Sequence, residues 1–238
     1  MTIQIAVVHE ANADFIIATD FADRVLFESV MWLRDQNFDD CRVWHSETVT
    51  GRALTWAGIK KLSSDAKIRG HGHFRPRGSG PNEPGANDAK SARKAILFVL
   101  KEFPGIDAIV LIRDQDNYRD RRLGFAQARD EVHSTIPVVV SLAVLMREAW
   151  VLSGFNPESD EELARLQAAR QRLGLDPRTR SHEVRDPKLA LRELTAGDPE
   201  RERQCWVSTP LDTLRERGTD NGLTDFLADE RLRLAVLF

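Results

Sequence analysis

The sequence contains little cysteine. Cys41 and Cys205 are its only two cysteines among 238 residues, and they lie far apart. This argues against a disulfide framework and against a zinc site built on thiolates. A chain so poor in cysteine suits a reducing compartment, and we therefore expect a cytoplasmic protein.

Long apolar runs are also missing. The chain opens on a short strand-like run, residues 3–8, with no basic segment followed by an apolar stretch. We therefore expect no signal peptide. The longest apolar runs are far shorter than the roughly 20 residues that a membrane span requires, so we expect no membrane partner.

Neither sign of charge dominates. The chain carries 34 Lys and Arg residues against 37 Asp and Glu residues, for a net charge of −3. This balance excludes a histone-like polycation but leaves room for a local basic groove that binds nucleic acid. With 42% hydrophobic residues, the chain is long enough for one large domain, or one domain with a smaller appendage.

Three common catalytic motifs are absent. The sequence contains no Walker loop, no Gly-x-Gly-x-x-Gly after the first apolar run and no Gly-x-Ser-x-Gly. ATPase, dinucleotide-binding and serine-hydrolase functions are therefore unsupported. If the activity needs ATP hydrolysis, a separate ATPase subunit must supply it.

Apolar runs rich in Val and Ile alternate with helical patterns in the first two thirds of the chain. The predicted strands are residues 3–8, 41–44, 108–112 and 136–142, of which 41–44 is the weakest and has the character of an edge strand. The predicted helices between them are residues 15–35, 89–103 and 119–131. Alternating strands and helices, with strands this apolar, predict an α/β protein with a Rossmann-like, mostly parallel sheet.

Two segments depart from this alternation. Residues 48–88 are dense in Gly and Pro towards their end, and we expect an irregular loop there. Beyond about residue 155 only helical patterns remain, at residues 162–173, 187–194, 210–217 and 223–234. We therefore divide the chain into an α/β domain, residues 1–155, and a helical C-terminal region, residues 156–238.

Acidic residues follow two of the predicted strands. Glu10 comes after residues 3–8, and Asp114-x-Asp116 comes after residues 108–112. Carboxylates this close repel each other unless a cation lies between them, and oxygen ligands suit Mg²⁺ or Mn²⁺. The structural alternative is that Asp116 caps the helix that follows it.

These residues resemble the pattern of the Toprim family, in which a Glu follows the first strand and an Asp-x-Asp follows a later hydrophobic strand. Residues 146–153 (MREAWVLS) are similar to a Glu-x-Trp-Leu-Leu stretch of small bacterial Toprim-like proteins related to OLD-family nucleases. The resemblance covers residues 1–155. It departs from the family at Ala11, where Gly is common, and at Asp14, where a second Glu is common.

The resemblance implies a metal-dependent nuclease that hydrolyses nucleic-acid phosphodiester bonds. Glu10, Asp114 and Asp116 would hold Mg²⁺ or Mn²⁺. Nuclease members add a further carboxylate and a lysine, for which Asp14, Glu148 and Lys188 are the candidates here, although Lys188 also suits an ordinary surface lysine. The resemblance further implies an effector of a bacterial anti-phage system acting beside an ATPase.

Basic residues offer contacts for DNA or RNA. The candidates are Arg69, His71, His73 and Arg75 in the Gly-rich segment, and Arg113 and Arg119 around the Asp-x-Asp. A disordered surface loop, for the Gly-rich segment, and an ordinary charged helix face, for Arg113 and Arg119, are the alternatives. The alternative function is a non-catalytic Toprim-like binding or regulatory module that acts through a protein partner. For the oligomeric state we expect a homodimer.

Overall fold

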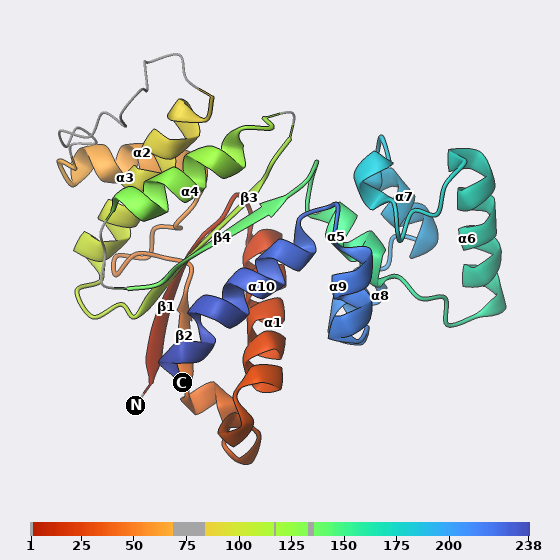
Figure 1. The fold of residues 1–238 in the computed structure, drawn as a ribbon, viewed down its shortest axis with the longest axis horizontal. Helices are drawn as coiled ribbons and strands as arrows, with labels where there is room; N and C mark the ends of the chain where they lie inside the picture. The colour runs from red at the N-terminus through yellow and green to blue at the C-terminus, as the bar shows by residue number, and fades with distance from the viewer. Residues whose placement is uncertain (1, 69–83, 117, 133–135) are drawn as a thin grey trace.

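Four parallel strands form the sheet in the described part of the computed structural model, which comprises residues 2–68, 84–116, 118–132 and 136–238. From one edge to the other the order is β2 (Arg42–His45), β1 (Ile3–Val8), β3 (Ala108–Asp114) and β4 (Val138–Ala143) (Figure 1). All four predicted strands are confirmed, including the weak one, which is the edge strand β2. The α/β Rossmann-like class with C-terminal helices is likewise confirmed.

Strands β1, β3 and β4 are apolar on both faces because each face is covered by helices. Along β1, Ile5 and Val7 belong to one hydrophobic cluster, whereas Ala6 and Val8 belong to another on the opposite face. Successive side chains of a strand point to opposite faces, so two cores sandwich the sheet. This double burial explains the unbroken Val and Ile runs that the sequence displays.

Helices from distant parts of the chain cover the two faces. One face carries α1 (Asn12–Ser29) and α10 (Leu223–Arg233), and the other carries α2 (Trp56–Asp65), α3 (Ala86–Glu102) and α4 (Arg121–Glu131) (Figure 1). Helix α1 is shorter than predicted. It ends at Ser29, and Met31–Asp35 form a 3₁₀ turn after Val30 adopts an extended conformation.

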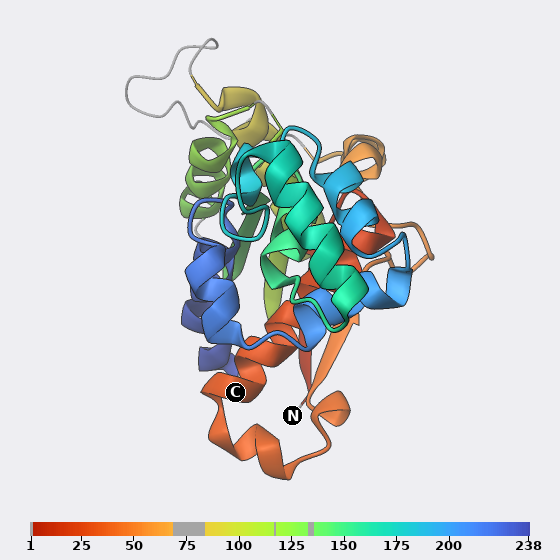
Figure 2. The ribbon, with the colours of Figure 1, turned by 90° about the vertical axis from the view of Figure 1, so that its right-hand side faces the viewer.

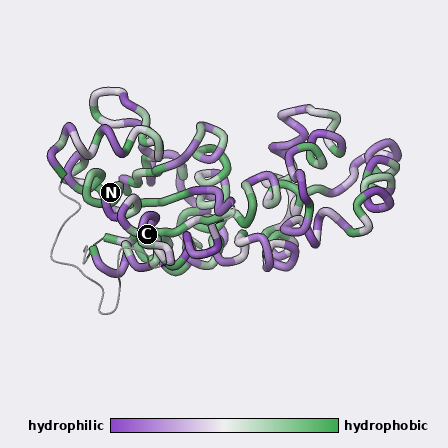
Figure 3. The backbone as a smooth tube through the Cα atoms, turned by 90° about the horizontal axis from the view of Figure 1, so that it is seen from above, coloured by the Kyte–Doolittle hydropathy of each residue, from purple (hydrophilic) through white to green (hydrophobic). Residues whose placement is uncertain are grey.

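The remaining helices extend from the end of the α/β unit that is remote from the two termini (Figure 3). They are α5 (Glu148–Gly154), α6 (Asp160–Leu173), α7 (Pro187–Leu194), α8 (Pro199–Val207) and α9 (Leu211–Arg217). Seen end-on, α6 stands in front of the others, and α10 lies beside α1 (Figure 2). Helix α8 was not predicted, although its Asp198 cap and Pro199 are a recognisable start signal.

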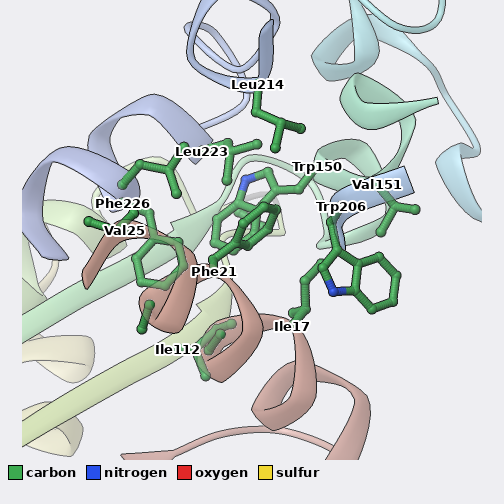
Figure 4. Packing of buried hydrophobic residues seen from close by; sticks show 14 of the residues in the cluster. Ile17, Phe21, Val25, Ile112, Trp150, Val151, Trp206, Leu214, Leu223 and Phe226 are labelled. Carbon is green, nitrogen blue, oxygen red and sulfur yellow. The ribbon is translucent and has the colours of Figure 1, made fainter. Parts of the chain in front are cut away.

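The hydrophobic core is continuous across residue 155. The ring of Trp150 stacks on Phe226 of α10, with 5.2 Å between centroids, and the edge of Phe21 from α1 meets both rings (Figure 4). The indole N–H of Trp150 also donates to the carbonyl of Asn221 at 2.8 Å. The last helix of the C-terminal region is therefore part of the layer that covers the sheet.

The expectation of an irregular loop over residues 48–88 is wrong at two places. Helix α2 occupies Trp56–Asp65, and α3 begins at Ala86. The Thr55 hydroxyl caps α2 by accepting the backbone N–H of Gly58 at 3.1 Å, and Ile59 and Leu62 bury its apolar side. Among the described helices, none combines the length and apolar character needed to cross a membrane.

Candidate acidic site at the carboxyl end of the sheet

The acidic residues lie at the point where the strand order of the sheet reverses. From β1 the chain proceeds to β2 on one side and later to β3 on the other, so β1 and β3 flank a topological switch point. Ligands of open α/β sheets bind outside the carboxyl ends of strands at such points. Glu10 follows β1, and Asp114 is the last residue of β3.

Asp114 is the most perturbed acid of this edge. Its pKa is raised to about 7, chiefly because burial penalises the charged form and secondly because Asp14 is negatively charged. The charges of Glu10 and Glu148 raise this pKa further, whereas a hydrogen bond from the backbone N–H of Arg147 (2.8 Å) lowers it. The fold thus gathers four predicted site residues, Glu10, Asp14, Asp114 and Glu148.

Arg147 pairs with the two buried members of this acidic cluster, which we define as Glu10, Asp14, Asp114 and Glu148. Its guanidinium lies 3.1 Å from the carboxylate of Asp14 and 3.2 Å from that of Glu148. Asp14 also accepts the backbone N–H of Ala11 at 2.7 Å, which fixes the first turn of α1. Asp14 and Glu148 are both buried, so these contacts hold them in a defined orientation.

Glu10 lies on the exposed side of the cluster and pairs with an arginine of its own. The side chain of Arg113 donates to the Glu10 carboxylate at 2.9 Å and lies 3.5 Å from Asp88. Its guanidinium also lies over the ring of Trp56, 5.4 Å from the centroid. Arg113, one of the predicted nucleic-acid contacts, therefore forms ion pairs with acids of this edge.

Asp116 is held apart from the cluster. It adopts a left-handed backbone conformation, with φ of 50°, and its carboxylate contacts the buried Arg121 at 3.0 Å. Arg121 also contacts Asp88 at 3.1 Å and the carbonyl of Asp114. The two acids of the Asp-x-Asp therefore face different partners. Asp116 is not the helix cap either, because Asp120 occupies that position before α4.

Lys188 is exposed in the first turn of α7. Its charge acts on Glu202 of α8, a residue that the sequence did not single out. Burial raises the pKa of Glu202, and so does Glu148, whereas Arg147 lowers it. Glu202 is thus within electrostatic range of Glu148 in the acidic cluster, and Lys188 acts on Glu202 rather than on the cluster. Local patterns gave no signal for Glu202, because only the packing of α8 against α5 places it there.

The remaining predicted nucleic-acid contacts divide into two sets. Arg119 is exposed and lines a cavity of about 740 Å³ together with Asp116 and Tyr118. Arg69, His71, His73 and Arg75 lie outside the described residues.

The donor chemistry of the acidic cluster suits a hard divalent cation. Every donor is a carboxylate oxygen, and burial together with the charges of Asp14, Glu10 and Glu148 raises the pKa of Asp114. Within the described ranges, however, no three His, Cys, Asp or Glu side chains are arranged as a ready metal site. Arg113 and Arg147 instead hold Glu10, Asp14 and Glu148 in ion pairs, so a cation would have to compete with these arginines.

Comparison with known proteins found no match to this chain among family models, curated proteins or solved structures. The Toprim resemblance therefore stays a prediction from its motifs.

Proposed function

We propose that the protein is a metal-dependent nuclease that hydrolyses nucleic-acid phosphodiester bonds. The observation that carries this proposal is Asp114, whose pKa is raised to about 7 by burial and by three neighbouring carboxylates at the β1–β3 switch point. Buried like charges cost stability, and strongly perturbed acids concentrate at functional sites. Glu10 and Asp114 also lie at the strand ends where the Toprim pattern has its acids, and this resemblance supports the proposal.

Asp114 and Glu10 would hold Mg²⁺ or Mn²⁺, with Asp14 and Glu148 beside them. Such a cation would stabilise negative charge on the phosphate and lower the pKa of water. Asp116, the third predicted ligand, would have to leave Arg121 in order to take part.

The chain's own residues have separable tasks in this proposal. Arg113 and Arg147 border the acids and would contact phosphate oxygens, for which the guanidinium group is well suited. Lys188 would reach a flanking phosphate from α7. The proposal also includes an anti-phage role and a separate ATPase subunit, both of which rest on the Toprim resemblance alone. It includes a cytoplasmic location, which rests on the low cysteine content alone.

One observation favours the alternative of a non-catalytic binding module. The ion pairs form a chain from Glu10 through Arg113, Asp88 and Arg121 to Asp116. In this alternative the arginines are the permanent counter-charges, and the edge of the sheet needs no cation. The exposed residues of this chain of ion pairs would then bind a protein partner.

A cleavage assay separates the two functions. Plasmid DNA, linear DNA and structured RNA are incubated with the protein in Mg²⁺, Mn²⁺ or EDTA. The test variant is Asp114→Asn, and its matched control is Asp160→Asn, which removes an exposed carboxylate in the first turn of α6. Metal-dependent cleavage that Asp114→Asn abolishes and Asp160→Asn preserves supports the nuclease. A folded protein that neither cleaves nor binds Mg²⁺ in calorimetry supports the binding module.

A further inference from the structure

A cleft of about 620 Å³ opens between α2 and α3, beside the exposed end of the acidic cluster. Trp56 anchors its floor, since its backbone N–H donates to the carbonyl of His9 and its indole N–H to that of Ile112. The cleft is lined by Glu10, Trp56, Ala57, Ile59, Lys60, Asn87, Lys90, Ser91, Lys94 and Arg113. It is therefore attached to the carboxyl ends of β1 and β3.

Three lysines line this cleft and form no ion pair with any described residue. Lys60 of α2 and Lys90 of α3 are exposed, and Lys94 is half-buried. Within the described residues none of the three side chains forms a hydrogen bond or an ion pair, whereas the side chain of Lys101 on α3 donates to the carbonyl of Ala66. Lys90 and Lys94 are also four residues apart, and like charges at this spacing weaken a helix. Uncompensated cations facing one cleft indicate an anionic ligand.

The cleft continues into the cavity of about 740 Å³ at the start of α4. The two share Asn87, Ser91 and Arg113 in their linings. The second cavity adds Arg119 and Tyr118, whose side chain is 61% exposed. Its lining also contains Asp88, Asp116 and Asp120, of which Asp88 and Asp116 are paired with arginines. The guanidinium of Arg121 lies over the Tyr118 ring, 4.9 Å from its centroid, and the exposed remainder of the ring is open to a ligand. The two cavities form one path, which we call the lysine path.

We propose that the lysine path binds a single-stranded nucleic acid. Lys60, Lys90 and Lys94 contact successive phosphates, and Tyr118 stacks on an unpaired base. A groove that combines cations with an exposed aromatic ring is the usual means of holding single strands, because a base in a duplex has no free face. The path spans two adjoining cavities, each large enough for a small ligand, so it suits a polymer better than a single nucleotide.

This inference deepens the proposed nuclease function. Cleavage of the bound strand rests on that function, whereas binding of the strand does not. The lysine path passes Glu10 and Arg113 and would deliver the strand to the acidic cluster. Binding itself requires no metal, so it is measured in EDTA.

The test compares two triple variants by fluorescence anisotropy with labelled single-stranded DNA, single-stranded RNA and duplex DNA. The test variant is Lys60→Gln/Lys90→Gln/Lys94→Gln. The charge-matched control is Lys61→Gln/Arg185→Gln/Arg231→Gln, which alters exposed cations outside the lysine path. We expect the test variant to raise the Kd for single strands by about tenfold or more, and to reduce the slope of log K against log salt by about 2. The control should leave both nearly unchanged.

Three results would overturn the inference: no binding of single strands by the unaltered protein, equal losses in the two triple variants, or duplex binding as tight as single-strand binding. Asp114→Asn keeps the two proposals distinguishable. If the lysine path binds but the acidic cluster does not cleave, the unaltered protein and Asp114→Asn both bind single strands and neither cuts them. If cleavage occurs but the path is not the binding site, the lysine variant binds normally while Asp114→Asn loses cleavage.

Discussion

The backbone N–H of Arg147 donates to the carboxylate of Asp114 at 2.8 Å, across the gap between the residues that follow β4 and the end of β3. The guanidinium of the same arginine contacts Asp14 and Glu148. One residue therefore orients three acids. Arg147 contacts Asp114 through its backbone N–H, so a change of its side chain leaves that hydrogen bond in place. The ion pairs with Asp14 and Glu148 can therefore be tested separately from the hydrogen bond to Asp114.

Asp114 makes the stability of the protein depend on pH. Its folded-state pKa of about 7 lies above the ordinary value of 3.8, so the folded state binds this proton more tightly than the unfolded state does. The stabilisation is fully present below about pH 4 and is lost as pH rises through 7. We expect Asp114→Asn to remove this loss, for a relative gain of at most about 4 kcal/mol at pH 8. Urea unfolding at several pH values measures it, and parallel pH profiles for the two proteins would contradict the assignment.

Glu230 predicts a second, independent pH effect in α10. Its side chain is fully buried, and neither carboxylate oxygen has a hydrogen-bond partner among the described residues. Burial, followed by the charges of Asp23 and Asp229, raises its pKa well above 4.5. The sign is the same as for Asp114: stability is full below the unfolded value and falls as pH rises towards the folded value.

Replacement of Glu230 by a residue of similar size should therefore stabilise the protein. We expect Glu230→Met to raise the free energy of unfolding by about 1–3 kcal/mol at pH 8 and by less at pH 4. Glu216→Met, on α9, is the control, because Glu216 makes no ion pair in the described part of the chain. A loss of stability in Glu230→Met at both pH values would mean that this carboxylate has a stabilising role.

Gly124 brings α3 and α4 into close contact. A Cβ atom at Gly124 would lie 2.3 Å from the carbonyl oxygen of Gly85 and 2.8 Å from the backbone nitrogen of Ala89. Alanine usually stabilises a helix relative to glycine, but here we expect Gly124→Ala to destabilise the protein by about 1–3 kcal/mol. At Gly105 an added Cβ meets no described atom within 4 Å, so Gly105→Ala should be nearly neutral. Thermal unfolding of both variants measures the difference. Equal effects at the two glycines would contradict this packing.

Phe226 tests whether the sheet and the C-terminal helices share one core. Its ring is fully buried between Trp150 and Phe21. We expect Phe226→Ala to lower the free energy of unfolding by about 3–5 kcal/mol. Far-ultraviolet circular dichroism and Trp fluorescence should still report one coincident transition. Two separated transitions in the unaltered protein would show that the C-terminal helices unfold independently of the sheet.

The sequence by itself determined β1, β3 and β4, because each is an apolar run that is buried on both faces of the sheet, whereas the edge strand β2 was visible only as a short alternating segment. It also determined most helices, whose apolar residues recur at the helical period: the predicted 187–194 coincides with α7. Helix α2 was missed because its short apolar side lies next to a segment dominated by Gly and Pro. The strand-end positions of Glu10 and Asp114 were visible in the same way, since each comes two residues after the end of an apolar run.

Tertiary structure alone decided which charges meet. Spacing suggested that Asp114 and Asp116 act together, yet the left-handed backbone at Asp116 turns its carboxylate to Arg121, while Asp114 faces Arg147. Glu202 reaches the acidic cluster from α8, and α10 returns to cover the sheet. The spacing of apolar residues within a segment indicates which of its faces is buried, so this can be predicted from the sequence. Ion pairs between distant segments depend instead on distances of a few ångströms, which only the packing of the whole chain sets.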